Sequence, residues 1–207
     1  MFLNQFKSEV VCHQTTNEGE TMTLMSDGVL SLPDGGEIDM KTKAKKELMF
    51  DNHPGNVFRV VGDMVYVAGL MKNENIVAES PTGDVYHSNV YVLCIDWKTG
   101  QRVWDRKLGL GGATALAVSS DSVYVAGFRE YVEDDRAKTV VAKLDLAGQL
   151  VWQVEEEVAG LHHPTEIDLR PNGLVVYVDS FNTFLGVSNR FFMKIDHDGL
   201  IQDIHTL

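Results

Sequence analysis

The hydrophobic positions of this chain fall into short runs that are separated by turn residues. Val-Tyr-Val-Ala-Gly at residues 65–69 recurs at residues 123–127, and it returns as Val-Tyr-Val-Asp-Ser at residues 176–180. Each run follows another apolar stretch and a tight turn, and the dominant period is two residues. Short alternating runs bounded by Gly, Asp, Asn or Pro predict antiparallel strands that are joined as hairpins.

Two further elements follow each hairpin. Segments that end at Asp96, Asp145 and Asp196 predict a third strand, and after a glycine turn a fourth strand carries Trp104 or Trp152. The three aspartates are 49 and 51 residues apart, and the two tryptophans are 48 residues apart. Four-stranded units at this period are typical of a β-propeller. We therefore predict an all-β, β-propeller-like array of about four four-stranded antiparallel blades, with Trp104 and Trp152 packed between blades.

The blade boundaries follow from the same spacing. Three clear blades are expected at residues 57–108, 109–158 and 159–207, after a degenerate first blade at residues 1–56 that holds a closure strand and a charged insertion. Together they form one domain. This places 151 of the 207 residues in clear repeats.

The degenerate first blade aligns with the later ones in two ways. In the favoured alignment residues 23–30 match residues 194–201, an earlier strand lies at residues 9–13, and residues 35–53 are inserted. In the rival alignment the pair at residues 38–39 matches the Ile-Asp pair at residues 95–96. Both alignments stay open at this stage.

Four blades leave open a closed ring, an arc completed by a partner or second copy, or a fragment. An uncovered blade exposes an apolar face and a strand edge. We therefore expect a closure strand, at residues 2–6 or 9–13, that pairs with the last blade around residues 199–204.

Charge and cysteine content narrow the classes of partner. The net charge of −12 argues against nucleic acid and against an anionic membrane surface, because both bind basic faces. No apolar run approaches the roughly 18 residues that span a bilayer, and the first residues do not form a secretory signal. We expect a reducing, soluble compartment such as the cytoplasm. Cys94 lies in an apolar strand and predicts a buried thiol, while a disulfide with Cys12 stays open.

The repeats resemble those of the quinoprotein-like β-propellers, also called PQQ-like, and of related bacterial β-propeller repeats. A blade of that group reads as an apolar strand, an Asp or Gly turn, V-Y-V-A-G, and then K-L-D-x-x-G-x-x-x-W. Residues 115–152 match almost throughout, and residues 57–104 match with a longer loop. In the fourth repeat Asp203 stands where the pattern has tryptophan. The resemblance implies the architecture and no particular activity, since propellers host many functions. No motif for a quinone cofactor is present to carry over.

Candidate binding residues gather around two His-Pro pairs. His53 and His163 each precede an expected first strand, on the connection that runs near the central axis of a propeller. Glu166 follows closely, and Asp179 replaces the alanine found in the two other copies of its strand. Imidazoles and carboxylates can bind a divalent metal at such an axial site. Ordinary turn chemistry and a loop hydrogen bond explain the same residues without a ligand.

These observations favour a non-enzymatic β-propeller-like interaction module or scaffold subunit, without a cofactor. The expected partner is a protein, for which a basic surface would complement the acidic chain, or a second copy of the chain. Trp97, in a turn, and the charged loops at residues 73–88 and 129–138 are the expected contact points. The alternative is a small-ligand-binding propeller or a metal-dependent hydrolase or lyase with its site at the central axis. No catalytic residue is assigned in either case.

Overall fold

The computed structural model of the 207-residue chain describes residues 10–15, 21–25, 29–31, 37–39, 57–78, 85–130, 137–157, 161–182 and 186–207. These residues form sixteen strands arranged in four antiparallel sheets of four strands each. The all-β prediction of four-stranded antiparallel units is confirmed. Over the same ranges, no helix is long and apolar enough to cross a membrane.

Each sheet contains four strands that are consecutive in the chain. The first sheet holds β1 (Val10–Thr15), β2 (Thr21–Met25), β3 (Val29–Ser31) and β4 (Glu37–Asp39). The second holds β5 (Val57–Val61), β6 (Met64–Ala78), β7 (Val85–Asp96) and β8 (Gln101–Leu110). The third holds β9 (Gly112–Val118), β10 (Ser122–Glu130), β11 (Ala137–Asp145) and β12 (Leu150–Glu157). The fourth holds β13 (Leu161–Arg170), β14 (Gly173–Asn182), β15 (Val187–Ile195) and β16 (Ile201–Thr206).

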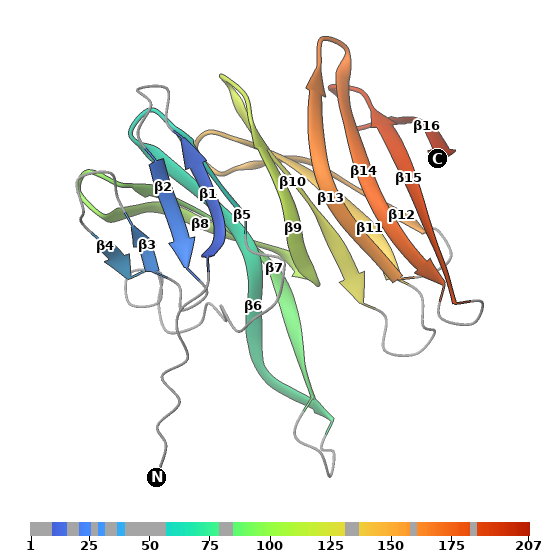
Figure 1. Ribbon diagram of the computed structural model, residues 1–207, viewed down its shortest axis with the longest axis horizontal. Coiled ribbons are helices and arrows are strands. Elements are labelled where there is room, and N and C mark those ends of the chain that lie inside the picture. Colours follow the sequence, from blue (N-terminus) through green and yellow to red (C-terminus); the bar gives the residue numbers. More distant parts are fainter. Residues whose placement is uncertain are drawn as a thin grey trace.

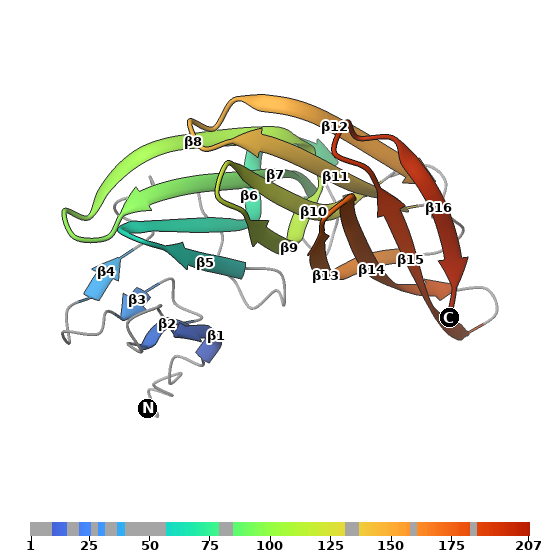
Figure 2. The same ribbon diagram turned by 90° about the horizontal axis from the view of Figure 1, so that it is seen from above.

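The sheets follow one another in a curved row. The first strands of the four sheets, β1, β5, β9 and β13, lie against one another in that order. Seen from above, the first and fourth sheets stand at opposite ends of the row, and the row does not close into a ring (Figure 2). Among the sheets that the described residues form, none follows the fourth, so one broad side of it has no further sheet packed on it.

The expected closure strand is wrong for the described part of the N-terminal segment. Strand β1, Val10–Thr15, pairs with β2 inside the first sheet, and β16 pairs with β15 at the edge of the fourth. Residues 10–15 pair locally because only five residues separate β1 from β2 in the chain, whereas the fourth sheet is at the far end of the row. Residues 2–6 lie outside the described residues.

Both alignments of the first blade are also wrong. Strand β2 is the second strand of its sheet and not the third, so residues 23–30 do not match residues 194–201. Strand β4 is the fourth strand, so residues 38–39 do not match residues 95–96, and residues 37–39 are not part of an insertion. The very short strands gave too few apolar positions to fix the register from sequence.

The hairpin pairings correct the alignment of the last repeat by two residues. Val60 pairs with Val65 and Val118 with Val123, and the equivalent pair in the fourth sheet is Leu169 with Leu174. In each case a two-residue turn sets the register. The repeat therefore begins at Leu174 and not at Val176.

This two-residue shift changes which residue of the fourth sheet stands at the alanine position of the Val-Tyr-Val-Ala-Gly run. Tyr177, and not Asp179, occupies the position of Ala68 and Ala126, while Asp179 matches Phe128. Two valine-containing runs, Leu-Val-Val and Val-Tyr-Val, overlap in the fourth repeat and hid the true register.

The core lies between successive sheets. Val65, Tyr66, Val67 and Ala68 are all at most 4% exposed, because the second sheet is covered on both faces. One cluster joins the second and third sheets, and another joins the third and fourth. A strand buried on both sides reads as a continuous apolar run, which explains Val-Tyr-Val-Ala. The period of two is clear only in strands with one exposed face.

Two tryptophans link the second sheet to the third and the third sheet to the fourth, which confirms their predicted packing. The Trp104 indole N–H donates to the Leu146 carbonyl at 2.8 Å, in the turn after β11. The Trp152 indole donates to the His197 carbonyl at 2.9 Å, in the turn after β15. A Cβ atom on Gly148 would lie 2.5 Å from the Trp104 ring, so the glycine lets the turn approach the indole.

The stretch at residues 73–88 is not a loop. Strands β6 and β7 continue as a paired ribbon through Lys72–Ser88 and Ile76–Tyr86, and the ribbon projects beyond the other strands (Figure 1). Residues 79–84 at its tip lie outside the described residues. In the third sheet β10 and β11 likewise pair out to Glu130 and Ala137, inside the stretch 129–138 that was expected to be a loop.

Candidate functional site: the terminal face of the fourth sheet

The fourth sheet has one face that none of the three other described sheets covers, and we call it the terminal face. On β14, Val176 and Val178 belong to the core shared with the third sheet, so their neighbours Val175, Tyr177 and Asp179 point the other way. Register pairs extend this face across the sheet. Its members are His163, Glu166, Asp168 and Arg170 on β13, Val175, Tyr177 and Asp179 on β14, Arg190, Phe192 and Lys194 on β15, and Asp203 and His205 on β16.

Comparison with the third sheet shows how unusual this face is. At equivalent register positions, Ala115 is replaced by Glu166 and Ala117 by Asp168. Trp152 is replaced by Asp203.

Val154 is likewise replaced by His205, and the smaller Ala126 and Val141 by Tyr177 and Phe192. In the third sheet these positions form the apolar core against the next sheet. In the fourth they are polar or aromatic and accessible.

One end of the terminal face carries a row of charged groups. His163, Asp179 and Arg190 are register partners on β13, β14 and β15. Arg190 binds the Asp179 carboxylate with two donors, Nε to Oδ1 at 2.7 Å and Nη2 to Oδ2 at 3.3 Å. The hydrogen bonds and charge of Arg190, with a smaller effect from His163, lower the pKa of Asp179. Glu166 is close enough for its charge to act on Arg190.

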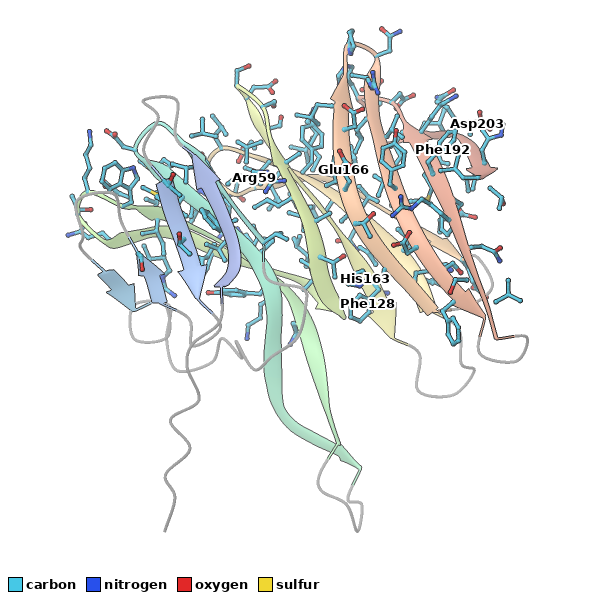
Figure 3. The ribbon with its side chains drawn as sticks, in the orientation of Figure 1. Arg59, Phe128, His163, Glu166, Phe192 and Asp203 are labelled. Atoms are coloured by element: carbon cyan, nitrogen blue, oxygen red, sulfur yellow. The ribbon has the colours of Figure 1, made fainter. Side chains whose placement is uncertain are left out.

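The middle of the face is aromatic. Tyr177 and Phe192 are paired across β14 and β15, and their ring centroids are 6.2 Å apart. The Phe192 ring also lies 5.2 Å from the His205 ring and 5.4 Å from the Lys194 ammonium. Glu166 from β13 completes this row opposite Tyr177. Figure 3 shows Glu166, Phe192 and Asp203, which come from three different strands.

The other end carries two ion pairs within the sheet. Lys194 lies 3.5 Å from the Asp203 carboxylate, which also contacts His205 at 2.5 Å. Arg170 pairs with Asp168 on the same strand. Partial desolvation raises the pKa of Asp203, but the hydrogen bonds and charges of His205 and Lys194 together outweigh it, so the pKa is lowered. The Asp203 carboxylate is therefore ionised at neutral pH, and both carboxylates have a cationic partner within the sheet.

A hollow of about 510 Å³ opens on this face. Val175, Tyr177 and Phe192 contribute its apolar floor, and Arg170, Lys194 and Gln202 contribute polar groups at its edge. An accessible aromatic floor with an ion-paired rim is the composition of a small protein–protein interface. None of these groups is a nucleophile with an adjacent base, so the arrangement is suited to binding.

The structure brings together three of the five predicted site residues. His163, Glu166 and Asp179 share the terminal face, whereas His53 lies outside the described residues. The expected setting of His163 is wrong, because His163 and Pro164 lie inside β13 and not in the connection before it. The missing N–H of Pro164 is tolerated because β13 is an edge strand of its sheet.

The arrangement offers little to a metal ion. The Asp179 carboxylate already accepts two hydrogen bonds from Arg190. Within the described ranges, no group of three or more His, Cys, Asp or Glu side chains is placed to hold a metal.

Trp97 lies on the second sheet, away from the terminal face. Its indole N–H donates to the Gly62 carbonyl at 3.2 Å, and the Lys98 ammonium lies 5.9 Å from its ring. Lys98 also bridges to Asp63 at 2.7 Å. These contacts tie the turn after β7 to the turn after β5, so Trp97 has a local role in holding two turns together.

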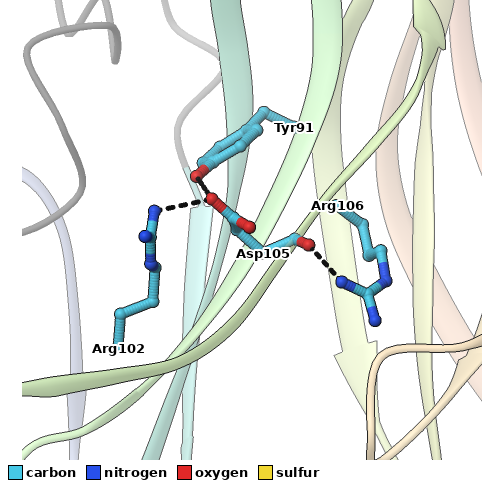
Figure 4. Close-up of polar contacts among 4 residues, drawn as sticks. All are labelled: Tyr91, Arg102, Asp105 and Arg106. Atoms are coloured by element: carbon cyan, nitrogen blue, oxygen red, sulfur yellow. Dashed lines mark hydrogen bonds and ion pairs between the residues drawn. The ribbon is translucent and has the colours of Figure 1, made fainter.

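A second polar cluster lies on the second sheet (Figure 4). The Tyr91 hydroxyl donates to the Asp105 carboxylate at 2.7 Å, and Arg102 donates to the same oxygen at 2.7 Å. Arg106 donates to the Asp105 carbonyl at 2.6 Å and to the Gly148 carbonyl at 2.7 Å, on the third sheet. Burial, followed by the Asp105 contact, raises the pKa of Tyr91. A tyrosine held in its neutral form by these contacts joins strands and sheets and is not a base.

Sequence reasoning missed most of the terminal face, notably Tyr177, Arg190, Phe192 and Lys194. A usable signal was present in the chain. Asp145 and Asp196 are 51 residues apart, and a shift of 51 residues aligns Ala115 with Glu166 and Ala117 with Asp168. Charged residues at positions that are apolar in the preceding repeat identify an uncovered face.

Comparisons with models of known protein families and with curated proteins find no match to this chain.

Proposed function

We propose that this chain is a non-enzymatic, β-propeller-like scaffold that binds protein through the terminal face of its fourth sheet. The observation that carries the proposal is the replacement of the inter-sheet core by ion-paired and aromatic side chains on that face. The sheets behind it form a continuous packed row, linked by Trp104 and Trp152, that holds the face rigid. Binding to a rigid surface avoids much of the entropy cost of ordering an interface.

We also propose that the arrangement of the sheets is related to that of a β-propeller. Four-stranded sheets with their first strands side by side are the arrangement of propeller blades. The quinoprotein-like repeat pattern supports kinship with that group. We favour the open arc among the three arrangements left by the sequence, because an open arc accounts for an accessible end face.

Native mass spectrometry of the protein isolated gently from its source tests the proposal. We expect a complex that contains a second polypeptide or a second copy, and its loss in a Phe192→Ala variant. Val187→Ala, at a 45% exposed position on the same strand, is the matched control and should keep the complex. A bare monomer, or a complex that Phe192→Ala leaves intact, would refute the terminal face as the binding surface.

A further inference from the structure

We infer that the partner of the terminal face is a second copy of this chain, bound face to face about a twofold axis parallel to the strands. The inference rests on the proposed function and names the partner. Twofold homodimers are the commonest soluble oligomers, and such an interface joins the same surface patch on both copies. The terminal face has to be complementary to itself for this to happen.

The charge on the face permits the approach of two identical acidic molecules. The chain carries a net charge of −12, yet the terminal face has four carboxylates and three Lys or Arg side chains. Its net charge of −1, from three positive and four negative groups, makes it a nearly neutral patch. Repulsion between the two acidic copies is therefore small where these faces meet.

The register of the sheet determines which residues meet. A twofold axis parallel to the strands places β14 opposite β15 of the second copy, and β13 opposite β16. Each row of register partners across the sheet therefore faces the same row of the second copy in the opposite order. In the first row, which holds His163, Asp179 and Arg190, Asp179 then faces Arg190 of the second copy. In the second row Tyr177 faces Phe192, and Glu166 faces His205.

The third row holds Asp168, Val175, Lys194 and Asp203. Its charges cancel within each copy when Arg170, the partner of Asp168, is counted with it. Asp168 faces Asp203 across the axis, but each carboxylate already has its own cation, Arg170 and Lys194. A twofold axis perpendicular to the strands is disfavoured, because it places Arg190 opposite Lys194 and Glu166 opposite itself. Charge complementarity therefore selects the parallel axis.

The size of the face fits a modest, reversible dimer. Four strands about 4.8 Å apart and about eight residues long cover roughly 500 Å² per copy, or about 1,000 Å² for two. This is near the lower limit for a specific interface. The aromatic row lies at the centre and the ion pairs lie at the rim, which is the usual distribution of the two classes.

Sedimentation velocity of the purified full-length chain is the direct test, run over roughly a hundredfold range of concentration so that mass action is visible. We expect a monomer–dimer equilibrium that weakens when salt is added, because the rim pairs are screened. Trimming the β6–β7 ribbon, by joining Lys72 to Ser88 through an Asn-Gly turn, should leave the equilibrium unchanged.

A pair of charge variants tests the geometry itself. Asp179→Arg makes the first row positive in every copy, and Arg190→Asp makes it negative in every copy. Each variant alone should be monomeric because like charges meet across the axis. An equimolar mixture should form heterodimers, since the opposite charges then face each other. A structural defect in either variant would not be repaired by mixing two separately folded proteins.

The outcomes separate this inference from the proposed function. Monomeric wild type at every concentration, or no gain on mixing the two variants, overturns the second copy as partner. If the complex from the source then contains a different polypeptide that Phe192→Ala releases, the proposed function stands without this inference. A bare monomer in both experiments refutes both.

Discussion

Removal of the Trp104 indole should weaken the contact between the second and third sheets and lower the free energy of unfolding. Trp104 is 8% exposed and packs against Tyr66 with 6.0 Å between ring centroids. Its N–H binds Leu146 at 2.8 Å. Truncation of a buried tryptophan costs about 3–5 kcal/mol, which sets the expectation for Trp104→Ala. Trp104→Phe keeps most of the apolar contact and loses the hydrogen bond, so we expect about 1–2 kcal/mol.

Urea unfolding followed by far-ultraviolet circular dichroism measures these changes. The matched control is Val103→Ala, because Val103 precedes Trp104 on β8, points to the other side and is 54% exposed. An exposed substitution of this kind costs within about 0.5 kcal/mol. If Trp104→Ala is no more destabilising than Val103→Ala, the indole does not hold the two sheets together, and the linkage argued from its contacts is refuted.

Gly148 supplies an independent check on the same contact. A Cβ at this position would lie 2.5 Å from Trp104 Cδ2, and the backbone φ is +78°. Gly148→Ala therefore adds a clash and a backbone strain. In a Trp104→Ala background the clash disappears and only the strain remains. The two substitutions should be strongly non-additive, and simple additivity would contradict direct contact between indole and turn.

Two further predictions concern ionisable groups. Burial raises the pKa of the free Cys94 thiol to about 11. In a Cys12→Ser background, Cys94 should resist an aromatic disulfide reagent at pH 8 until urea unfolds the protein, and rapid native labelling would contradict its burial. Because the Asp179 pKa is lowered in the folded state, its stabilising effect is present above the ordinary value of 3.8 and is lost as the pH falls through the lower folded value. The small stability difference between wild type and Asp179→Asn should thus shrink in acid unfolding measured below pH 3.8, and a difference that persists there would rule out the Arg190 pairing as its source.

For the second, third and fourth sheets, the sequence predicted the strands and their grouping because local signals determine both. Short apolar runs and turns with glycine specify hairpins without reference to distant parts of the chain. The positions of Trp104 and Trp152 were also predictable, since both recur at the same place in the repeat. These features depend on contacts within one sheet or between neighbours in the row.

Features that depend on register or on the ends of the row were not predictable in the same way. The overlap of two valine-containing runs near Val176 allowed two registers, and the turn at Pro171 and Asn172 decides between them. A shift of two residues keeps the same side chains on the same face, so the hydrophobic pattern alone gives no warning. The consequence was that Asp179, and not Tyr177, was aligned with the alanine of the repeat.

The candidate site was only partly predictable for a related reason. His163, Glu166 and Asp179 were selected as unusual residues, and the structure places them on one face. Their partner Arg190 belongs to β15, where nothing in the local pattern marks it. Ion pairs between strands depend on register, and the register of β15 follows from the hairpin that precedes it.

The position occupied by Trp104, Trp152 and Asp203 shows how one repeat can either continue a row or present a surface. In the second and third sheets the side chain at this position donates a hydrogen bond to the next sheet. In the fourth it is a carboxylate that binds Lys194 and His205 within its own sheet. The same backbone position thus changes from bonding between sheets to bonding within a sheet. The alanines at positions 115 and 117, on the first strand of the third sheet, change to Glu166 and Asp168 in the fourth. Because positions on both edge strands change together, the switch involves the whole face, and exposure of that face to water explains it better than drift at single positions.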